Sequence, residues 1–167
     1  MIFVLALGLA LALQAALTAP EVFWLLSPMH VWLVVVVAKA RRQAPGQAGW
    51  FGLVAGLGAD LVRGLPLGPS AIASVFAAAL VAKVSAVFEL AGPLFWVVGT
   101  LAGSMVTEAT VSLIYFTLGA PPPHGLVGSA AAVAGTSLLG LLTAFFEWWW
   151  QQQFSPQARR RRALRRR

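Results

Sequence analysis

The chain has 167 residues, of which 59% are apolar and only 10% are charged. A soluble domain of this size carries about 25% charged residues, so we expect an all-α membrane protein rather than a soluble globule. The chain has no cysteine, which excludes disulfides and thiolate metal sites. The net charge of +7 resides almost wholly in the last nine residues, so it gives little support for nucleic-acid binding.

Six apolar segments follow one another along the chain and predict a bundle of six transmembrane helices. Their expected bounds are 1–19, 28–40, 47–62, 70–90, 94–118 and 126–148. The first segment lacks the basic start of a secretory signal peptide, so we interpret it as a span. Gln14 within it is a polar group at membrane depth, which we expect to hydrogen-bond to a neighbouring helix. The domain prediction is a six-span membrane domain over 1–150 and a basic cytoplasmic tail over 151–167.

The basic residues predict how the chain is oriented in the membrane. Lys39, Arg41 and Arg42 and the seven arginines of the tail make up ten of the twelve Lys and Arg residues. With six spans, all ten fall on one side, and the positive-inside rule places both termini in the cytoplasm. The tail arginines are Arg159, Arg160, Arg161, Arg162, Arg165, Arg166 and Arg167. They either fix this topology, bind anionic lipid headgroups or contact an acidic cytoplasmic protein; without interleaved aromatic residues, RNA binding is disfavoured.

A stripe of small residues runs along the third segment. Gly49, Gly52, Gly56 and Asp60 are spaced by three, four and four residues, which places them on one face of a helix. Glycines on one face of an apolar helix let another backbone approach closely. We therefore predict a helix-packing face here, either within the bundle or toward a partner's transmembrane helix.

The stripe ends in a segment that cannot continue as a helix, because Gly64, Pro66 and Gly68 break it. One interpretation is that Asp60 accepts hydrogen bonds from the backbone of this turn or from a partner helix. The other is that Asp60 forms a local ion pair with Arg63, three residues later, which contributes only a few tenths of a kcal/mol when it is solvated.

Two ionisable residues fall inside predicted spans. Glu108 lies near the middle of the fifth, where an acid costs roughly 2.5–3.5 kcal/mol on insertion scales. It is either a satisfied structural acid, with Ser104, Thr107 and Thr110 as nearby partners, or a ligand or proton site. Lys83 lies in the fourth span at a different depth, so a direct pair with Glu108 is strained. Alternatively, the side chain of Lys83 extends along the helix to the inner lipid headgroups.

Constellations typical of catalysis are missing from the sequence. His30 and His124 are separated from each other and from other ligands, so no metal-binding spacing is present. Ser104 has no histidine partner within a helix, and there is no phosphate-binding loop with its lysine. We expect a protein that is not an enzyme and that carries neither cofactor nor metal. Glu89 and Glu147, at the expected cytoplasmic interface, are predicted to meet basic residues.

One motif resembles a known family. The residues Gly56-Leu57-x-x-Asp60-Leu61-x-x-Gly64-x-Pro66-Leu67-Gly68 are similar to the central motif of MreD, a rod-shape-determining membrane protein family of bacteria. Leu13-Gln14 and Pro28 fit as well, whereas Met29 and His30 stand where family members often have a polar or acidic residue directly after the proline.

The resemblance implies a non-enzymatic component of the cell-elongation machinery in the bacterial cytoplasmic membrane. Such a protein forms a complex with the single-span protein MreC. It is linked through MreC to the filament protein MreB and to the peptidoglycan synthase pair of RodA and a class B penicillin-binding protein. The family is also distantly similar in fold to the substrate-binding subunits of energy-coupling-factor vitamin transporters.

That transporter subunit is the alternative function. It requires polar or aromatic groups that converge near the outer loops, and Trp24, His30, Arg63 and His124 are the only candidates there. A flippase for lipids or cell-wall precursors is a third possibility, and it requires a charged central cavity that Lys83 and Glu108 alone do not establish.

Overall fold

The computed structural model describes residues 2–17, 29–88 and 92–154, and the regular structure in these ranges is entirely α-helical. The helices are α1 (Ile2–Leu17), α2 (Val31–Ala40), α3 (Pro45–Arg63), α4 (Pro69–Val87), α5 (Pro93–Thr117) and α6 (Gly125–Phe154). The predicted all-α class is confirmed. The tail arginines, Trp24, Pro28 and Glu89 lie outside the described residues.

Proline and glycine set the helix boundaries. Pro45, Pro69 and Pro93 each occupy the first turn of a helix, where the missing N–H would have had no partner within the helix. Gly64 ends α3 in the left-handed conformation with φ +63°, which glycine adopts without a Cβ penalty.

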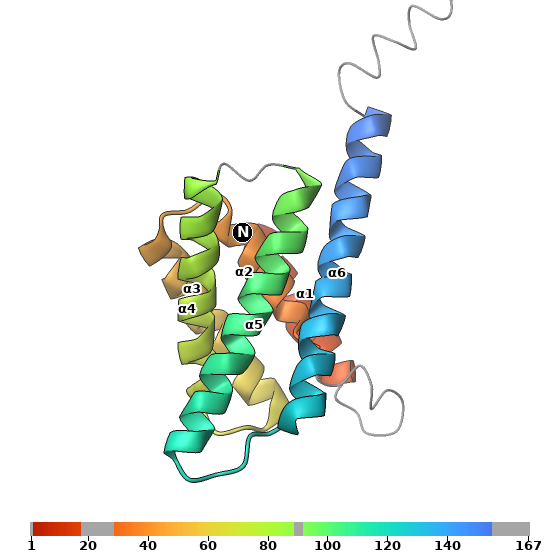
Figure 1. Cartoon of the computed structure of the whole chain (residues 1–167). Helices are drawn as coiled ribbons and strands as arrows, with labels where there is room; N and C mark the ends of the chain where they lie inside the picture. The colour runs from red at the N-terminus through yellow and green to blue at the C-terminus, as the bar shows by residue number, and fades with distance from the viewer. Residues whose placement is uncertain (1, 18–28, 89–91, 155–167) are drawn as a thin grey trace, which may run out of the picture.

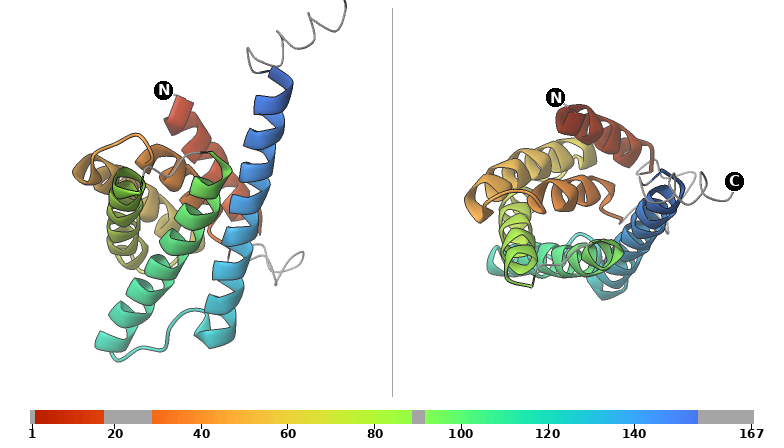
Figure 2. Two further views of the ribbon diagram at one scale, coloured as in Figure 1. Left: turned by 45° about the horizontal axis from the view of Figure 1, so that its top comes forward. Right: turned by 90° about the horizontal axis from the view of Figure 1, so that it is seen from above.

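The short helix α2 is the centre of the bundle, because it contacts each of the other five helices. Viewed along the bundle, α2 lies inside an arc formed by its neighbours (Figure 2). Trp32, Leu33, Val36 and Val37 are all buried. A helix that is apolar all round belongs in an interior, and the valine-rich sequence of α2 meets that requirement.

The helices differ in whether they can cross a bilayer. α4, α5 and α6, up to Gln153, are long and apolar enough to do so, whereas α1 and α2 are apolar but shorter. With 10 residues, α2 is about 15 Å long, half of the roughly 30 Å of a hydrocarbon core. The second predicted segment, 28–40, therefore overestimates the helix, which begins only at Val31.

Successive helices alternate in direction, so the start of α1 and the end of α6 lie at the same end of the bundle (Figure 1). α6 packs against α5 and, more lightly, against α2. It extends past the other helices, with Trp148, Trp149 and Trp150 partly exposed near its end.

Candidate functional site

The strongest polar constellation surrounds the start of α2. A helix leaves its first N–H groups without partners in its own backbone, and in lipid such groups must be satisfied inside the protein. Side chains from two distant helices do this here. The His30 N–H donates to the Thr136 hydroxyl on α6 at 3.0 Å, and the Val31 N–H donates to the Gln14 amide oxygen on α1 at 3.0 Å. The predicted hydrogen bond of Gln14 to a neighbouring helix is present.

The imidazole of His30 joins two more helices. Its Nε2 lies 2.7 Å from Glu108 Oε1 on α5, and its Nδ1 lies 3.0 Å from a terminal nitrogen of Arg63 on α3. The same Arg63 nitrogen donates to the carbonyl of Met29 at 3.1 Å. A guanidinium only donates, so Nδ1 must accept and Nε2 must carry the hydrogen that is donated to Glu108. The geometry therefore assigns a neutral His30 in one tautomer.

We call Gln14, His30, Arg63, Glu108 and Thr136 the α2 hub. It gathers side chains from α1, α3, α5 and α6 around the residues that open α2. Gln14, His30 and Thr136 are at most 2% exposed and Glu108 is 7% exposed. Hydrogen bonds in so enclosed a site are stronger than in water, and an unpaired member costs more. The hub can therefore hold the helices in one arrangement.

The hub corrects two sequence-based interpretations. His30 is not isolated, since it contacts both Arg63 and Glu108. The hydrogen-bond partner of Glu108 is His30. The expected partners Ser104 and Thr107 instead donate to backbone carbonyls one turn back on α5.

Asp60 organises the turn between α3 and α4. Its Oδ2 accepts the N–H of Gly68 at 2.9 Å, and its carbonyl accepts the N–H of Leu65 at 3.1 Å. Asp60 therefore accepts hydrogen bonds from the backbone of this turn, as the first sequence-based interpretation states. The second interpretation, a local ion pair between Asp60 and Arg63, is wrong. Arg63 instead contacts Met29 and His30, and the ion pairs in the described ranges join other residues.

The glycine stripe faces α4. A Cβ added at Gly52 would lie 2.5 Å from the carbonyl oxygen of Ser74, and one at Gly56 would overlap the carbonyl oxygen of Ser70. Gly49 has more room, with its nearest contact to Val75 at 3.4 Å. The close-packing surface at Gly52 and Gly56 is thus occupied by the chain's own α4.

A second polar cluster lies at the other end of α2. Arg41 pairs with Glu147 at 3.3 Å, the indole nitrogen of Trp96 donates to the same carboxylate, and Gln151 donates to it at 3.1 Å. Glu147 thus meets a basic residue, as the sequence predicts. Lys83 is exposed on α4 and forms no ion pair with any residue that the structure describes.

His124 lies directly before α6, beside the hub. Burial lowers the pKa of His124 below its ordinary 6.5, and the positive charge of Arg63 lowers this pKa further. Among the described residues, no three His, Cys, Asp or Glu side chains come close enough to hold a metal ion.

Comparisons with known proteins do not place the chain: no family model, no curated protein and no solved structure matches it. The sequence signal for the hub was its set of polar residues in apolar surroundings, Gln14, His30 and Glu108. Spacing could not join them, because His30 and Glu108 are 78 positions apart.

Proposed function

We propose that this chain is a non-enzymatic scaffold of the bacterial rod-shape complex, in which it binds MreC and helps to control lateral peptidoglycan synthesis. In this proposal the chain spans the cytoplasmic membrane six times, with both termini inside. MreC is the direct partner, while MreB, RodA and a class B penicillin-binding protein are reached indirectly, and no nucleic acid is involved. The fold would then be similar to that of the transporter substrate subunits.

One observation carries this proposal: the residues of the MreD-like motif form one structural unit. Gly56 lies against α4, Asp60 accepts the N–H of Gly68, and Gly64 supplies the left-handed end of α3. A motif whose residues build one packed helix face and the turn that follows it is explained by architecture rather than by reaction chemistry. This agrees with a scaffold role.

Two further observations support it. The grooves between α3 and α4 and between α5 and α6 are lined by apolar residues, with Ser129 and Ser137 as the exceptions. Such walls suit lipid or protein better than a polar vitamin. In addition, Lys39 in the last turn of α2 and Arg41 and Arg42 directly after this helix lie at the end of the bundle where α1 starts and α6 ends. A cytoplasmic location of both termini requires this arrangement.

The test is recovery of a partner. The full chain, carrying an affinity tag and expressed at its native level, should co-purify MreC from mild-detergent extracts, and its depletion should turn rods into spheres. Normal rods after depletion, together with no MreC in the eluate, would contradict the proposal. A vitamin in the purified protein, detected by mass spectrometry, would favour the transporter subunit instead.

Glycine variants of the stripe are unsuitable for this test. Gly56→Leu would drive its side chain into the backbone of α4, so a lost complex would report a lost fold. Variants on the edge helices avoid this problem. Leu9 on α1 and Leu142 on α6 are 74% and 65% exposed, so Leu9→Trp and Leu142→Trp should keep the fold. If MreC binds along α1 or along α6, the variant on that helix should no longer co-purify MreC. The variant on the other helix should still co-purify it and serves as the control.

A further inference from the structure

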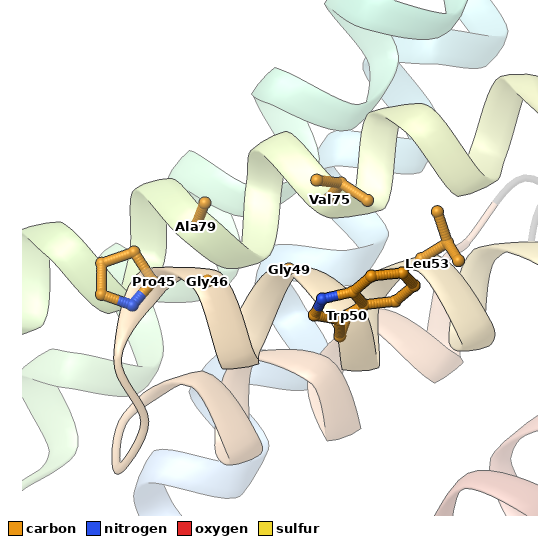
Figure 3. Close-up of a pocket in the computed structure, with 7 residues that line it drawn as sticks. All are labelled: Pro45, Gly46, Gly49, Trp50, Leu53, Val75 and Ala79. Atoms are coloured by element: carbon orange, nitrogen blue, oxygen red, sulfur yellow. The ribbon is translucent and has the colours of Figure 1, made fainter.

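An apolar groove runs between α3 and α4 on the outer face of the bundle (Figure 3). It has a volume of about 350 Å³ and is lined by Pro45, Gly46, Gly49, Trp50, Leu53, Val75 and Ala79. Gly46 and Gly49 contribute no side chains to its lining, and a Cβ added at Gly46 would meet nothing within 4 Å, so a larger side chain there has room. Leu53 follows Gly46 by seven positions, about 10 Å along the helix axis.

Two cations flank the end of the groove that begins at Pro45. Arg42 is exposed in the turn three residues before Pro45. Lys83 is exposed on α4, one turn beyond Ala79 on the same helix face. Because α4 runs antiparallel to α3, the helical turn of α4 that follows Ala79 continues past the Pro45 end of the groove (Figure 3).

These two cations are not neutralised by acids in the described part of the chain, where Arg41 is the basic residue that pairs with Glu147. Lys83 lies four residues before the end of α4, about 6 Å along the axis. A cation at this depth on a lipid-facing surface is costly unless its head reaches the membrane interface, where water and lipid headgroups lie.

We propose that the groove binds one anionic phospholipid from the leaflet at the basic end of the bundle. One acyl chain lies between Trp50 on one side and Val75 and Ala79 on the other. The phosphate lies between Lys83 and Arg42. This assignment gives Lys83 the counter-charge that the fold does not supply. It depends on the chain being in a membrane, not on the rod-shape role.

Charge distinguishes this occupant from a helix of a second copy. An apolar transmembrane helix would fill the groove but leave both cations without a partner. An anionic lipid satisfies the apolar walls and the cationic mouth together, whereas a zwitterionic lipid brings its own ammonium group to the same place.

The test measures lipid binding to the purified full chain by native mass spectrometry, with phosphatidylglycerol and phosphatidylcholine offered in equal amounts. We expect the wild type to retain phosphatidylglycerol preferentially. Lys83→Gln and Arg42→Gln should each weaken this binding about fivefold, and Lys83→Arg should preserve it. Gly46→Leu should abolish retention by filling the groove.

Gly8→Leu is the matched control. Gly8 lies on α1, away from the groove, and a Cβ there also meets nothing within 4 Å. Its leucine should leave binding unchanged, and lipid bound to the tail is common to all variants. Circular dichroism confirms that each variant keeps its helices.

Three outcomes would overturn the proposal: phosphatidylglycerol retention by Gly46→Leu equal to wild type, equal retention of the two lipids, or a dimer that Gly46→Leu converts to a monomer. A second readout uses the fluorescence of Trp50, which lines the groove. Phosphatidylglycerol with brominated acyl chains should quench the wild type more than Trp50→Phe, and equal quenching would also contradict the proposal.

Discussion

The two ends of α2 hold charged groups in different ways. At its start, His30 is 2% exposed and connects Arg63 with Glu108. At its other end, Arg41 pairs with Glu147 while their side chains keep 24% and 27% of their surface exposed.

Aromatic rings add to the ion pair at that second end. The Lys39 ammonium lies 4.6 Å from the centre of the Phe3 ring, and the Arg41 guanidinium lies 4.9 Å from that of Phe95. Cation–π contacts at exposed sites contribute only about 0.5–1 kcal/mol, whereas the hub depends on enclosed hydrogen bonds between its members. We infer that the start of α2 fixes the arrangement of the helices and that its end adapts to the membrane surface.

The sharpest test of this difference removes the acid of each end. Glu108→Ala leaves the buried Nε2–H of His30 without its acceptor and takes away the acid that bonds to the Arg63–His30 pair. We expect a loss of about 3–5 kcal/mol in the free energy of unfolding. Glu108→Gln keeps an acceptor for His30 and should lose less. The measurement is denaturant unfolding in detergent. If Glu108→Ala loses less free energy of unfolding than Glu147→Ala, the end of α2, and not its start, is the part that fixes the arrangement of the helices.

Asp60→Ala tests the turn beside the hub. Removing Oδ2 leaves the N–H of Gly68 without its acceptor. A buried unsatisfied group costs about 1–3 kcal/mol, and because Gly68 is half-buried we expect a loss near the low end of this range. The same unfolding assay measures the loss. Asp60→Asn is the control because it keeps an oxygen acceptor; a loss as large as that of Asp60→Ala would show that the charge matters more than the hydrogen bond.

Glu147→Ala probes the basic end. Partly exposed ion pairs contribute about 0–1 kcal/mol, so we expect a small change in stability even though Arg41, Trp96 and Gln151 all contact this carboxylate. A loss above 2 kcal/mol, well beyond the range of about 0–1 kcal/mol, would mean that both ends of α2 are equally rigid.

The smallest expected effect concerns pH. The lowered pKa of His124 means that the unfolded chain binds its proton more readily than the folded chain does. Stability must then fall as the pH drops below about 6.5. The melting temperature of the wild type should decrease more between pH 7.5 and pH 5 than that of His124→Gln. Identical decreases would show that protonation of His124 does not contribute to the pH dependence of stability.

Local chemistry made much of this fold predictable. Prolines and glycines gave the start of α4, the start of α5 and the end of α3 to within a few residues. Asp60 could be placed at its turn because its partner, Gly68, is only eight residues away. The need for a hydrogen bond at Gln14 followed from its apolar surroundings alone.

The hub was not predictable for a physical reason. Its members come from four helices and from the residue before α2, and only tertiary packing brings them together. The length of α2 was also overestimated. An apolar run is the same in sequence whether it crosses a bilayer or ends halfway inside a bundle, and Pro28 gave no sign that the helix begins at Val31.

The length of α6 has a consequence for whatever follows it. Its 30 residues make a rod of about 45 Å, against a hydrocarbon core of roughly 30 Å. If its first turn lies at one membrane surface, its last turns emerge well beyond the other. The end of α6 is therefore held off the bundle on a stiff rod, so a protein that binds there need not approach the lipid surface.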